Sequence, residues 1–168
     1  MKTETVNDDG SWCVENRKDN RLHGKQEQVY SDGSWEIENW KDDKRHGRQE
    51  QVNPDGSRFV SNWKDGKKHG KWERVYQDGS WISGTRKDGK KHGRWEWMRS
   101  NGSWSVEHWR DGKFHGKFEQ VNSDGSWHVS NWKSNKPHGR QEWVGSNGSW
   151  ILEIYDNGVL VNSRTSED

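Results

Sequence analysis

The stretch Asp55-Gly-Ser-Arg-Phe-Val-Ser-Asn-Trp-Lys-Asp-Gly-Lys-Lys-His-Gly-Lys-Trp-Glu-Arg-Val-Tyr-Gln77 sets the pattern of the chain, because its frame returns in steps of 23 residues along nearly the whole sequence. Its turn glycine recurs as Gly10, Gly33, Gly56, Gly79, Gly102, Gly125 and Gly148. A His-Gly pair recurs at His23, His46, His69, His92, His115 and His138. A fixed period without slips is the signature of stacked structural repeats, so we expect any function to be spread over several copies.

The composition is poor in apolar residues but rich in tryptophan. Of 168 residues, 25% are hydrophobic and 33% are charged, which is too little aliphatic mass for an ordinary two-layer core. The fourteen tryptophans argue against disorder, because disordered chains are poor in aromatic residues. A net charge of +1 predicts no general attraction to nucleic acid or to a membrane surface.

The chain carries no recognisable targeting signal. Its start, Met-Lys-Thr-Glu-Thr, lacks an apolar h-region, and no apolar run approaches the length of a membrane span. Cys13 is the only cysteine, so an internal disulfide is excluded. We therefore expect a cytoplasmic protein.

Each copy is predicted to form two strands joined by a tight turn. Counted from the turn glycine as zero, positions two and four are apolar except at Arg58 and Ser83, and they alternate with polar residues, as in a strand that is half-buried on one face. The Lys-Asp-Gly-Lys sequence that follows predicts a two-residue type I′ turn, because glycine, and tolerably aspartate, accept positive φ. The second strand carries the His-Gly pair, a Lys or Arg, a Glu and then a Val or Met.

The odd period requires a device that keeps the copies in phase. Side chains alternate between faces, so 23 residues of unbroken pleat would invert every second copy. The residue pattern does not invert, and we therefore expect a three-residue loop at the Ser-Asp-Gly turn, with its glycine in the left-handed region. One face, termed the recurrent face, then carries the position-two tryptophans with the recurrent Val and Glu. The opposite, variable face carries the changing positions and the position-seven aromatics Trp40, Trp63, Trp109, Trp132 and Tyr155.

These features predict an all-β fold of tandem 23-residue β-hairpins, forming a single-layer, elongated, twisted or curved antiparallel sheet with about fifteen short strands and no helix. A single repeat domain is expected over residues 1–168. Residues 1–9 would form an N-terminal half-repeat cap, 10–148 six repeats, and 149–168 a degenerate C-terminal hairpin cap with a short tail. One copy buries too few large side chains to offset the entropy of ordering it, so stability must come from stacking.

The stretch from Gly56 to Gly79 resembles the MORN repeat, which shares its turn spacing, its Trp before the first turn and its Gly-Lys-x-His-Gly core. The sequences His-Gly-Lys-Trp-Glu at His69 and His-Gly-Arg-Trp-Glu at His92 are most similar to the bacterial antitoxin-like subgroup. The resemblance implies an open ribbon of hairpins that serves as a scaffold, a partner-binding surface or a binder of lipid headgroups. This chain departs from the family at the glycine in the first strand, which only Gly84 retains.

The recurrent titratable residues favour structural roles over catalysis or metal binding. Equivalent histidines in successive copies lie about 9 to 10 Å apart, whereas zinc ligands lie within about 2.0 to 2.3 Å of their ion. We expect these histidines to lock turns, and the Glu and Lys or Arg rows to pair across strands. His108 and His128 fall outside the pattern and are predicted to be surface substitutions. We expect no catalytic residue, no metal, no cofactor and no enzyme activity.

Three groups of residues receive candidate roles. The recurrent tryptophans are predicted to form the core: Trp12, Trp35, Trp81, Trp104, Trp127 and Trp150. Aromatic residues of the variable face are predicted to bind a protein partner: Tyr30, Trp72, Tyr76, Trp95, Trp97, Phe118 and Trp143. Turn lysines are predicted to form an anion-binding edge: Lys67, Lys68, Lys90 and Lys91.

A non-catalytic scaffold that engages a protein partner through the variable aromatic face is therefore the preferred function. The alternatives are a carbohydrate-binding module that uses the same tryptophans, and a binder of anionic lipid headgroups or polyanions along the lysine edge. An antitoxin or immunity protein is a narrower version of the first. No specific nucleic-acid partner is expected, and homodimerisation through the C-terminal hairpin is a further alternative.

Overall fold

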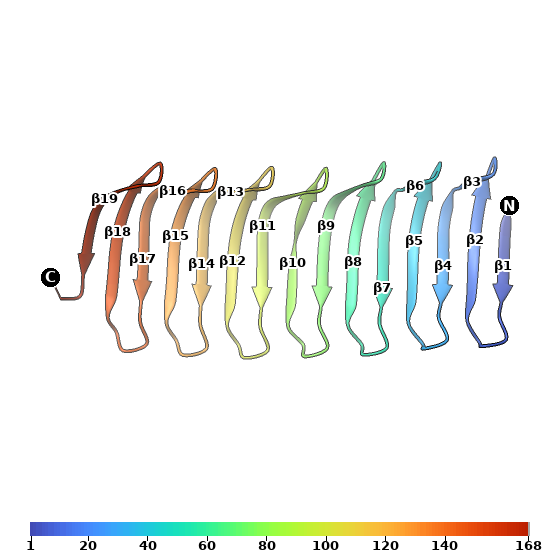
Figure 1. Ribbon diagram of the computed structural model, residues 1–168, viewed down its shortest axis with the longest axis horizontal. Helices are drawn as coiled ribbons and strands as arrows, with labels where there is room; N and C mark the ends of the chain where they lie inside the picture. Colours follow the sequence, from blue (N-terminus) through green and yellow to red (C-terminus); the bar gives the residue numbers. More distant parts are fainter. Residues whose placement is uncertain (168) are drawn as a thin grey trace. The chain divides into compact units, whose positions relative to one another are not determined.

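The computed structural model describes residues 1–167, which form nineteen β-strands and no helix (Figure 1). This confirms the predicted all-β array of antiparallel hairpins. The chain divides into two compact units, Met1–Asp78 with Thr85–Lys90, and Gly79–Gly84 with the residues from Lys91 onward. Since residues 1–167 form no helix at all, they contain none long and apolar enough to cross a membrane.

The strands are short and follow one another closely. The first unit contains β1 (Lys2–Val6), β2 (Trp12–Lys18), β3 (Arg21–Leu22), β4 (Gly24–Val29), β5 (Trp35–Lys41), β6 (Lys44–Arg45), β7 (Gly47–Val52), β8 (Arg58–Lys64) and β9 (Lys67–Val75). The residues of β10 (Trp81–Lys87) belong partly to each unit. The second unit continues with β11 (Lys90–Met98), β12 (Trp104–Arg110), β13 (Lys113–Phe114), β14 (Gly116–Val121), β15 (Trp127–Lys133), β16 (Lys136–Pro137), β17 (Gly139–Val144), β18 (Trp150–Asp156) and β19 (Val159–Thr165).

Within each unit, strands pair with their neighbours in chain order, and every pair is antiparallel. In the first unit the long strands run β1, β2, β4, β5, β7, β8 and β9. In the second unit they run β11, β12, β14, β15, β17, β18 and β19. Within a unit, the three-residue loops all lie at one end of the strands and the two-residue turns at the opposite end (Figure 1).

The strand count is higher than the fifteen expected, because four of the second strands are interrupted at their His-Gly pair. In the first complete copy, His23 separates β3 from β4, and Gly24 has a φ of 92°. The pairing with β2 slips there, between the pairs Arg17–Leu22 and Val14–Glu27. This bulge was not predicted from the sequence. The His-Gly pair was interpreted only as part of a regular second strand.

Both predicted turn types are confirmed. In the two-residue turn after β8, Asp65 and Gly66 have φ values of 50° and 80°, as a type I′ turn requires. In the loop before β8, the Asn53 amide donates to the Ser57 carbonyl at 2.9 Å, and Gly56 has a φ of 80°. This leaves three residues in the loop, with glycine in the left-handed region. The loop length keeps successive copies in phase.

The two-residue turns bind each copy to the preceding one. The Gly66 amide donates to the Arg45 carbonyl of the preceding copy at 2.9 Å. His46 Nδ1 lies 3.3 Å from an Asp65 carboxylate oxygen, and the pairs His23–Asp42, His69–Asp88, His92–Asp111 and His138–Asp156 repeat this contact. Five of the six recurrent histidines therefore lock turns, as predicted, and they do so between copies, whereas His115 has Ser134 in place of the aspartate.

The recurrent charged residues pair differently from the prediction. Each Lys or Arg contacts the Glu two residues further along its own strand, as in Arg48–Glu50 at 2.7 Å and Arg140–Glu142 at 2.8 Å. Residues two apart on a strand share a face, so the pair forms without a cross-strand partner. Cross-strand pairing is seen for Arg58 and Glu50, at 2.6 Å.

Candidate functional site

The aromatic residues predicted to bind a partner do not form one exposed surface. In the first unit, Tyr30 is 42% exposed and donates its hydroxyl to Glu36 at 3.1 Å. Trp72 is half-buried and packs edge-on against Phe59, with 5.6 Å between ring centroids. Tyr76 is half-buried under the guanidinium of Arg74, which lies 4.6 Å from the ring centre.

Trp95 of the second unit is completely buried, with 0% of its surface exposed. A Cβ on Gly84 would lie 2.2 Å from Cδ2 of the Trp95 indole, so the ring occupies the space that a side chain at residue 84 would fill. The Lys91 ammonium lies 4.6 Å from the same ring. Trp95 is therefore unavailable to a partner. The lone glycine at this repeat position was the sequence signal for its burial.

Phe118 and Trp143 enclose a histidine on the variable face of the second unit. The His128 ring stacks on Trp143 with 4.7 Å between centroids and an interplanar angle of 14°, and Phe118 lies 5.2 Å away on a tilted plane. Burial lowers the pKa of His128. The prediction that His128 is a surface substitution is therefore wrong. Trp97 is half-buried, and its buried Nε1 makes no hydrogen bond within the described chain.

The four turn lysines do not form a continuous basic edge. Lys67 and Lys90 are exposed, whereas Lys68 and Lys91 are half-buried among aromatic rings. Lys68 Nζ lies 5.4 Å from the centre of Phe59, and burial lowers the pKa of Lys68, with the positive charges of Arg86 and Arg45 adding to the effect. Lys91 Nζ lies 4.4 Å from the centre of Trp109 and 3.1 Å from Glu107. Half of the predicted edge thus supports the variable face.

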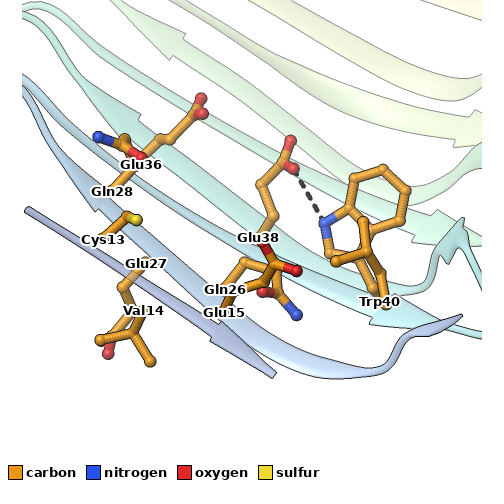
Figure 2. A pocket seen from close by; sticks show the side chains of 10 residues that line it. Cys13, Val14, Glu15, Gln26, Glu27, Gln28, Glu36, Glu38 and Trp40 are labelled. Atoms are coloured by element: carbon orange, nitrogen blue, oxygen red, sulfur yellow. Dashed lines mark hydrogen bonds between the residues drawn. The ribbon is translucent and has the colours of Figure 1, made fainter. Parts of the chain in front are cut away.

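A hollow of about 210 Å³ in the first unit is lined by Trp40 and by four carboxylates, Glu15, Glu27, Glu36 and Glu38. Figure 2 shows Glu38 beside Trp40, with the other three carboxylates further from the ring. Glu38 accepts hydrogen bonds from Trp40 Nε1 and Gln49 Nε2, each at 2.9 Å, and pairs with Arg45 at 2.7 Å. Glu15 pairs with Arg17, and Glu36 accepts from Tyr30. Glu27 pairs with Lys25, so each of the four carboxylates in this hollow has a partner within the first unit.

The position-seven tryptophans form what we call the variable-face row: Trp40, Trp63, Trp109 and Trp132. Each donates its indole N–H to the side chain two residues earlier on its strand, at 2.9, 2.8, 2.7 and 2.8 Å in that order. Their rings also pack internally. In the second unit, Phe114 lies edge-on between Trp109 and Trp132, at 4.8 and 5.2 Å. This row is therefore structural.

The position-two tryptophans form a different row on the recurrent face, termed the Trp–Val stripe. In the second unit, direct cross-strand pairs link Trp104, Val121, Trp127, Val144 and Trp150 in that order. In the first unit, the same pairing links Trp12, Val29, Trp35, Val52 and Arg58. Trp81 of β10 has the equivalent place in its copy.

The stripe is accessible and its hydrogen-bond donors are unused. Trp150 is 38% exposed, and the other stripe tryptophans are half-buried. Among residues 1–167, the stripe indoles make no hydrogen bond and no close ring contact, in contrast to the variable-face row. The predicted core residues therefore lie at the surface of a single sheet layer. A polar side chain stands two residues before each tryptophan of the variable-face row, whereas glycine stands two residues before each tryptophan of the stripe. This difference is the sequence signal that separates the two rows.

Hollows lie between successive members of the stripe. One of about 230 Å³ in the first unit is bounded by Trp12 and Trp35, with Val29 between them and Glu27 at its side. One of about 270 Å³ in the second unit is lined by Val144, Trp150, Leu152, Arg140 and Glu142. In the third complete copy, Arg58 replaces the tryptophan and interrupts the stripe.

No set of three or more histidine, cysteine or carboxylate side chains within residues 1–167 is placed to hold a metal ion. The equivalent His–Asp contacts instead repeat at the turns, each joining one histidine to one carboxylate.

Comparison with known proteins does not place the chain in a family. No family model and no curated protein matches it, so membership of the MORN family is not shown. Among solved structures, the SAS-4 (dCPAP) TCP domain of Drosophila melanogaster, in complex with a proline-rich motif of Ana2 (dSTIL), is similar over 98% of this chain and 88% of that one, with 14% identity and a TM-score of 0.39. The wild-type TCP10 domain of Danio rerio CPAP covers 97% of this chain and 88% of its own length, with 16% identity and a TM-score of 0.37. Likenesses at these scores carry no argument about function.

Proposed function

We propose that this chain is a non-catalytic repeat module that holds a protein partner on its Trp–Val stripe. The observation that carries the proposal is the row of accessible indoles whose N–H donors are unused within the described chain. Kinship with MORN repeats belongs to the same proposal, and the repeated hairpins and their turn chemistry support it.

Tryptophan is the residue type that most often dominates protein interfaces, because it combines a large apolar area with one hydrogen-bond donor. An indole that has already donated its N–H and packed its ring has little left to offer a ligand. Trp109 is of this kind, since Glu107 accepts its N–H at 2.7 Å. Trp104, on the same strand, retains both its donor and part of its ring surface.

The partner is still a protein, as expected from the sequence, but the proposed binding surface is the Trp–Val stripe instead of the variable face. Of the predicted variable-face set, Trp95 is buried, and Phe118 and Trp143 are packed around His128. Binding through these residues would require the variable face to give up its internal contacts. The stripe requires no such rearrangement, so it is the less costly surface to engage.

Selection of peptides from a random phage-displayed library against the immobilised protein tests the proposal. We expect enriched peptides that lose binding when Trp104 and Trp127 are both replaced by Ala, with sheet content unchanged by circular dichroism. The variant Trp132→Phe, altered on the opposite face of β15, serves as the control and should retain binding. Failure to enrich any stripe-dependent peptide contradicts a protein partner, and a stripe-dependent signal on a glycan array would replace it with carbohydrate.

A further inference from the structure

The stripe repeats at a distance that selects among peptide conformations. Trp104, Trp127 and Trp150 lie on β12, β15 and β18, and one valine strand separates each from the next. Two strand spacings of about 4.8 Å place successive indoles about 9.6 Å apart. A ligand that lies across the strands must therefore present the same face about every 9.6 Å.

Polyproline II meets this requirement best. It has three residues per turn and rises about 3.1 Å per residue, so every third residue returns to the same face after about 9.3 Å. An extended strand repeats its face after even numbers of residues, at about 6.6 or 13 Å. An α-helix repeats its face about every seven residues, or 10.5 Å. Over two intervals the mismatch is about 0.6 Å for polyproline II and about 1.8 Å for the helix.

The chemistry of the stripe agrees with its spacing. A polyproline II segment has no internal hydrogen bonds, so its carbonyl groups can accept from indole N–H donors. The stripe indoles have such donors free within residues 1–167. The hollow beside Val144 and the hollow between Trp12 and Trp35, with volumes of about 270 and 230 Å³, have more than enough room for a proline ring.

The charge of the stripe also fits such a ligand. Its tryptophans and valines are neutral, and the nearest carboxylates are already paired along their own strands, in Lys117–Glu119 and Arg140–Glu142. A surface without unpaired charge complements an uncharged, apolar segment better than a strongly acidic or basic one. In the first unit, Arg58 adds a charge to the row and ends it after two tryptophans.

We propose that the uninterrupted stripe of the second unit binds a proline-rich segment of a partner protein in the polyproline II conformation, laid across the strands so that every third residue meets one indole. This inference rests on the proposed function and specifies its ligand. Seven residues suffice to reach from Trp104 to Trp150, because six steps of about 3.1 Å span about 19 Å.

Fluorescence anisotropy with labelled oligoproline peptides of four and seven residues tests the inference on the full chain. We expect the heptamer to bind about tenfold more tightly than the tetramer, because it reaches a third indole. Replacing Trp127, the middle indole, by Ala should weaken heptamer binding about tenfold. A Gly-Ser peptide of seven residues should not bind, and Trp109→Phe, on the opposite face of β12, should leave the affinity unchanged.

Absence of heptaproline binding, or binding that survives loss of Trp104 and Trp127, overturns the inference. Its failure is distinguishable from failure of the proposed function. If phage-selected peptides depend on the stripe but are helical or lack proline, the function stands and the polyproline II ligand is wrong. If a β-linked oligosaccharide binds the stripe and heptaproline does not, both are wrong.

Discussion

Trp104 and Trp109 lie on the same strand, β12, and face opposite sides of the sheet, yet their surroundings differ completely. Trp109 donates its N–H to Glu107, packs edge-on against Phe114 and lies 4.4 Å from the Lys91 ammonium. Trp104 is paired across the sheet with Met98 and Val121 and makes no hydrogen bond within residues 1–167. Tryptophans that recur with the same 23-residue period therefore stabilise the sheet on the variable face and keep an unused N–H donor on the recurrent face.

Replacing each of the two tryptophans by alanine should give the largest difference in stability between the two faces. Trp109→Ala should lower the free energy of unfolding by about 3 kcal/mol, because it removes packing against Phe114 and leaves Glu107 without its indole donor. Trp104→Ala should cost about 1 kcal/mol, because the indole makes no hydrogen bond and no ring contact within residues 1–167 that its loss would break. Urea denaturation followed by circular dichroism measures both, and equal losses would contradict the division into two rows.

A methyl group on Gly84 tests how tightly the variable face is packed. Gly84→Ala would place Cβ 2.2 Å from the Trp95 indole, so we expect a loss of about 2 to 3 kcal/mol. The neighbouring variant Ser83→Ala, directed to the recurrent face, should change stability by less than about 0.5 kcal/mol. A stable Gly84→Ala protein with native sheet content would show that Trp95 is not held as described.

Replacing tryptophan by phenylalanine removes mainly the N–H donor, so it tests the hydrogen bonds of the two rows separately from their packing. Trp109→Phe leaves Glu107 with Lys91 as its remaining partner and should cost about 1 to 2 kcal/mol. Trp104→Phe removes an N–H that has no internal acceptor and should be close to neutral. Thermal melts of the two single variants provide the measurement, and a larger loss for Trp104→Phe would reverse the assignment.

The smallest expected effect is a pH dependence confined to the variable face. Burial lowers the pKa of His128 below its usual 6.5, so the unfolded chain binds the proton more readily than the folded one. The contribution of neutral His128 is therefore fully present above pH 6.5 and is lost as the pH falls from 6.5 through the lowered pKa. Urea midpoints of the wild type should fall between pH 7.5 and 5.5 by more than those of His128→Phe. Identical falls would remove His128 as the cause.

Much of the fold was predictable because residues that accept positive φ determine the turn types, and the alternation of side chains along a strand determines which residues share a face. Asp65 and Gly66 can both take positive φ, which fixes the two-residue turn, and the odd period required the three-residue loop that ends at Gly56. The bulge at Gly24 was missed, because a His-Gly pair with a polar residue after it does not by itself break the alternation of a strand.

The candidate site was harder to predict, because periodicity groups residues by face without saying which face is covered. The recurrent tryptophans were assigned to a core because Val14, Val60 and Val106 recur beside them, and these valines are indeed buried. The indoles extend beyond the valines and remain accessible, since each unit has a single layer. An indole N–H is satisfied where a polar side chain lies two residues earlier on the same strand, as Ser130 does before Trp132. The sequence contains this spacing, but periodicity by face does not reveal that the two side chains meet.

Solvent exchange of the indole N–H protons, measured by NMR on the full chain, tests the central distinction most directly. The protons of Trp40, Trp63, Trp109 and Trp132 donate to internal acceptors and should exchange slowly. Those of Trp12, Trp35, Trp104, Trp127 and Trp150 should exchange rapidly, because the described chain offers them no acceptor. Protection of the second group equal to that of the first would contradict the account, since the stripe would then have no free donors for a partner.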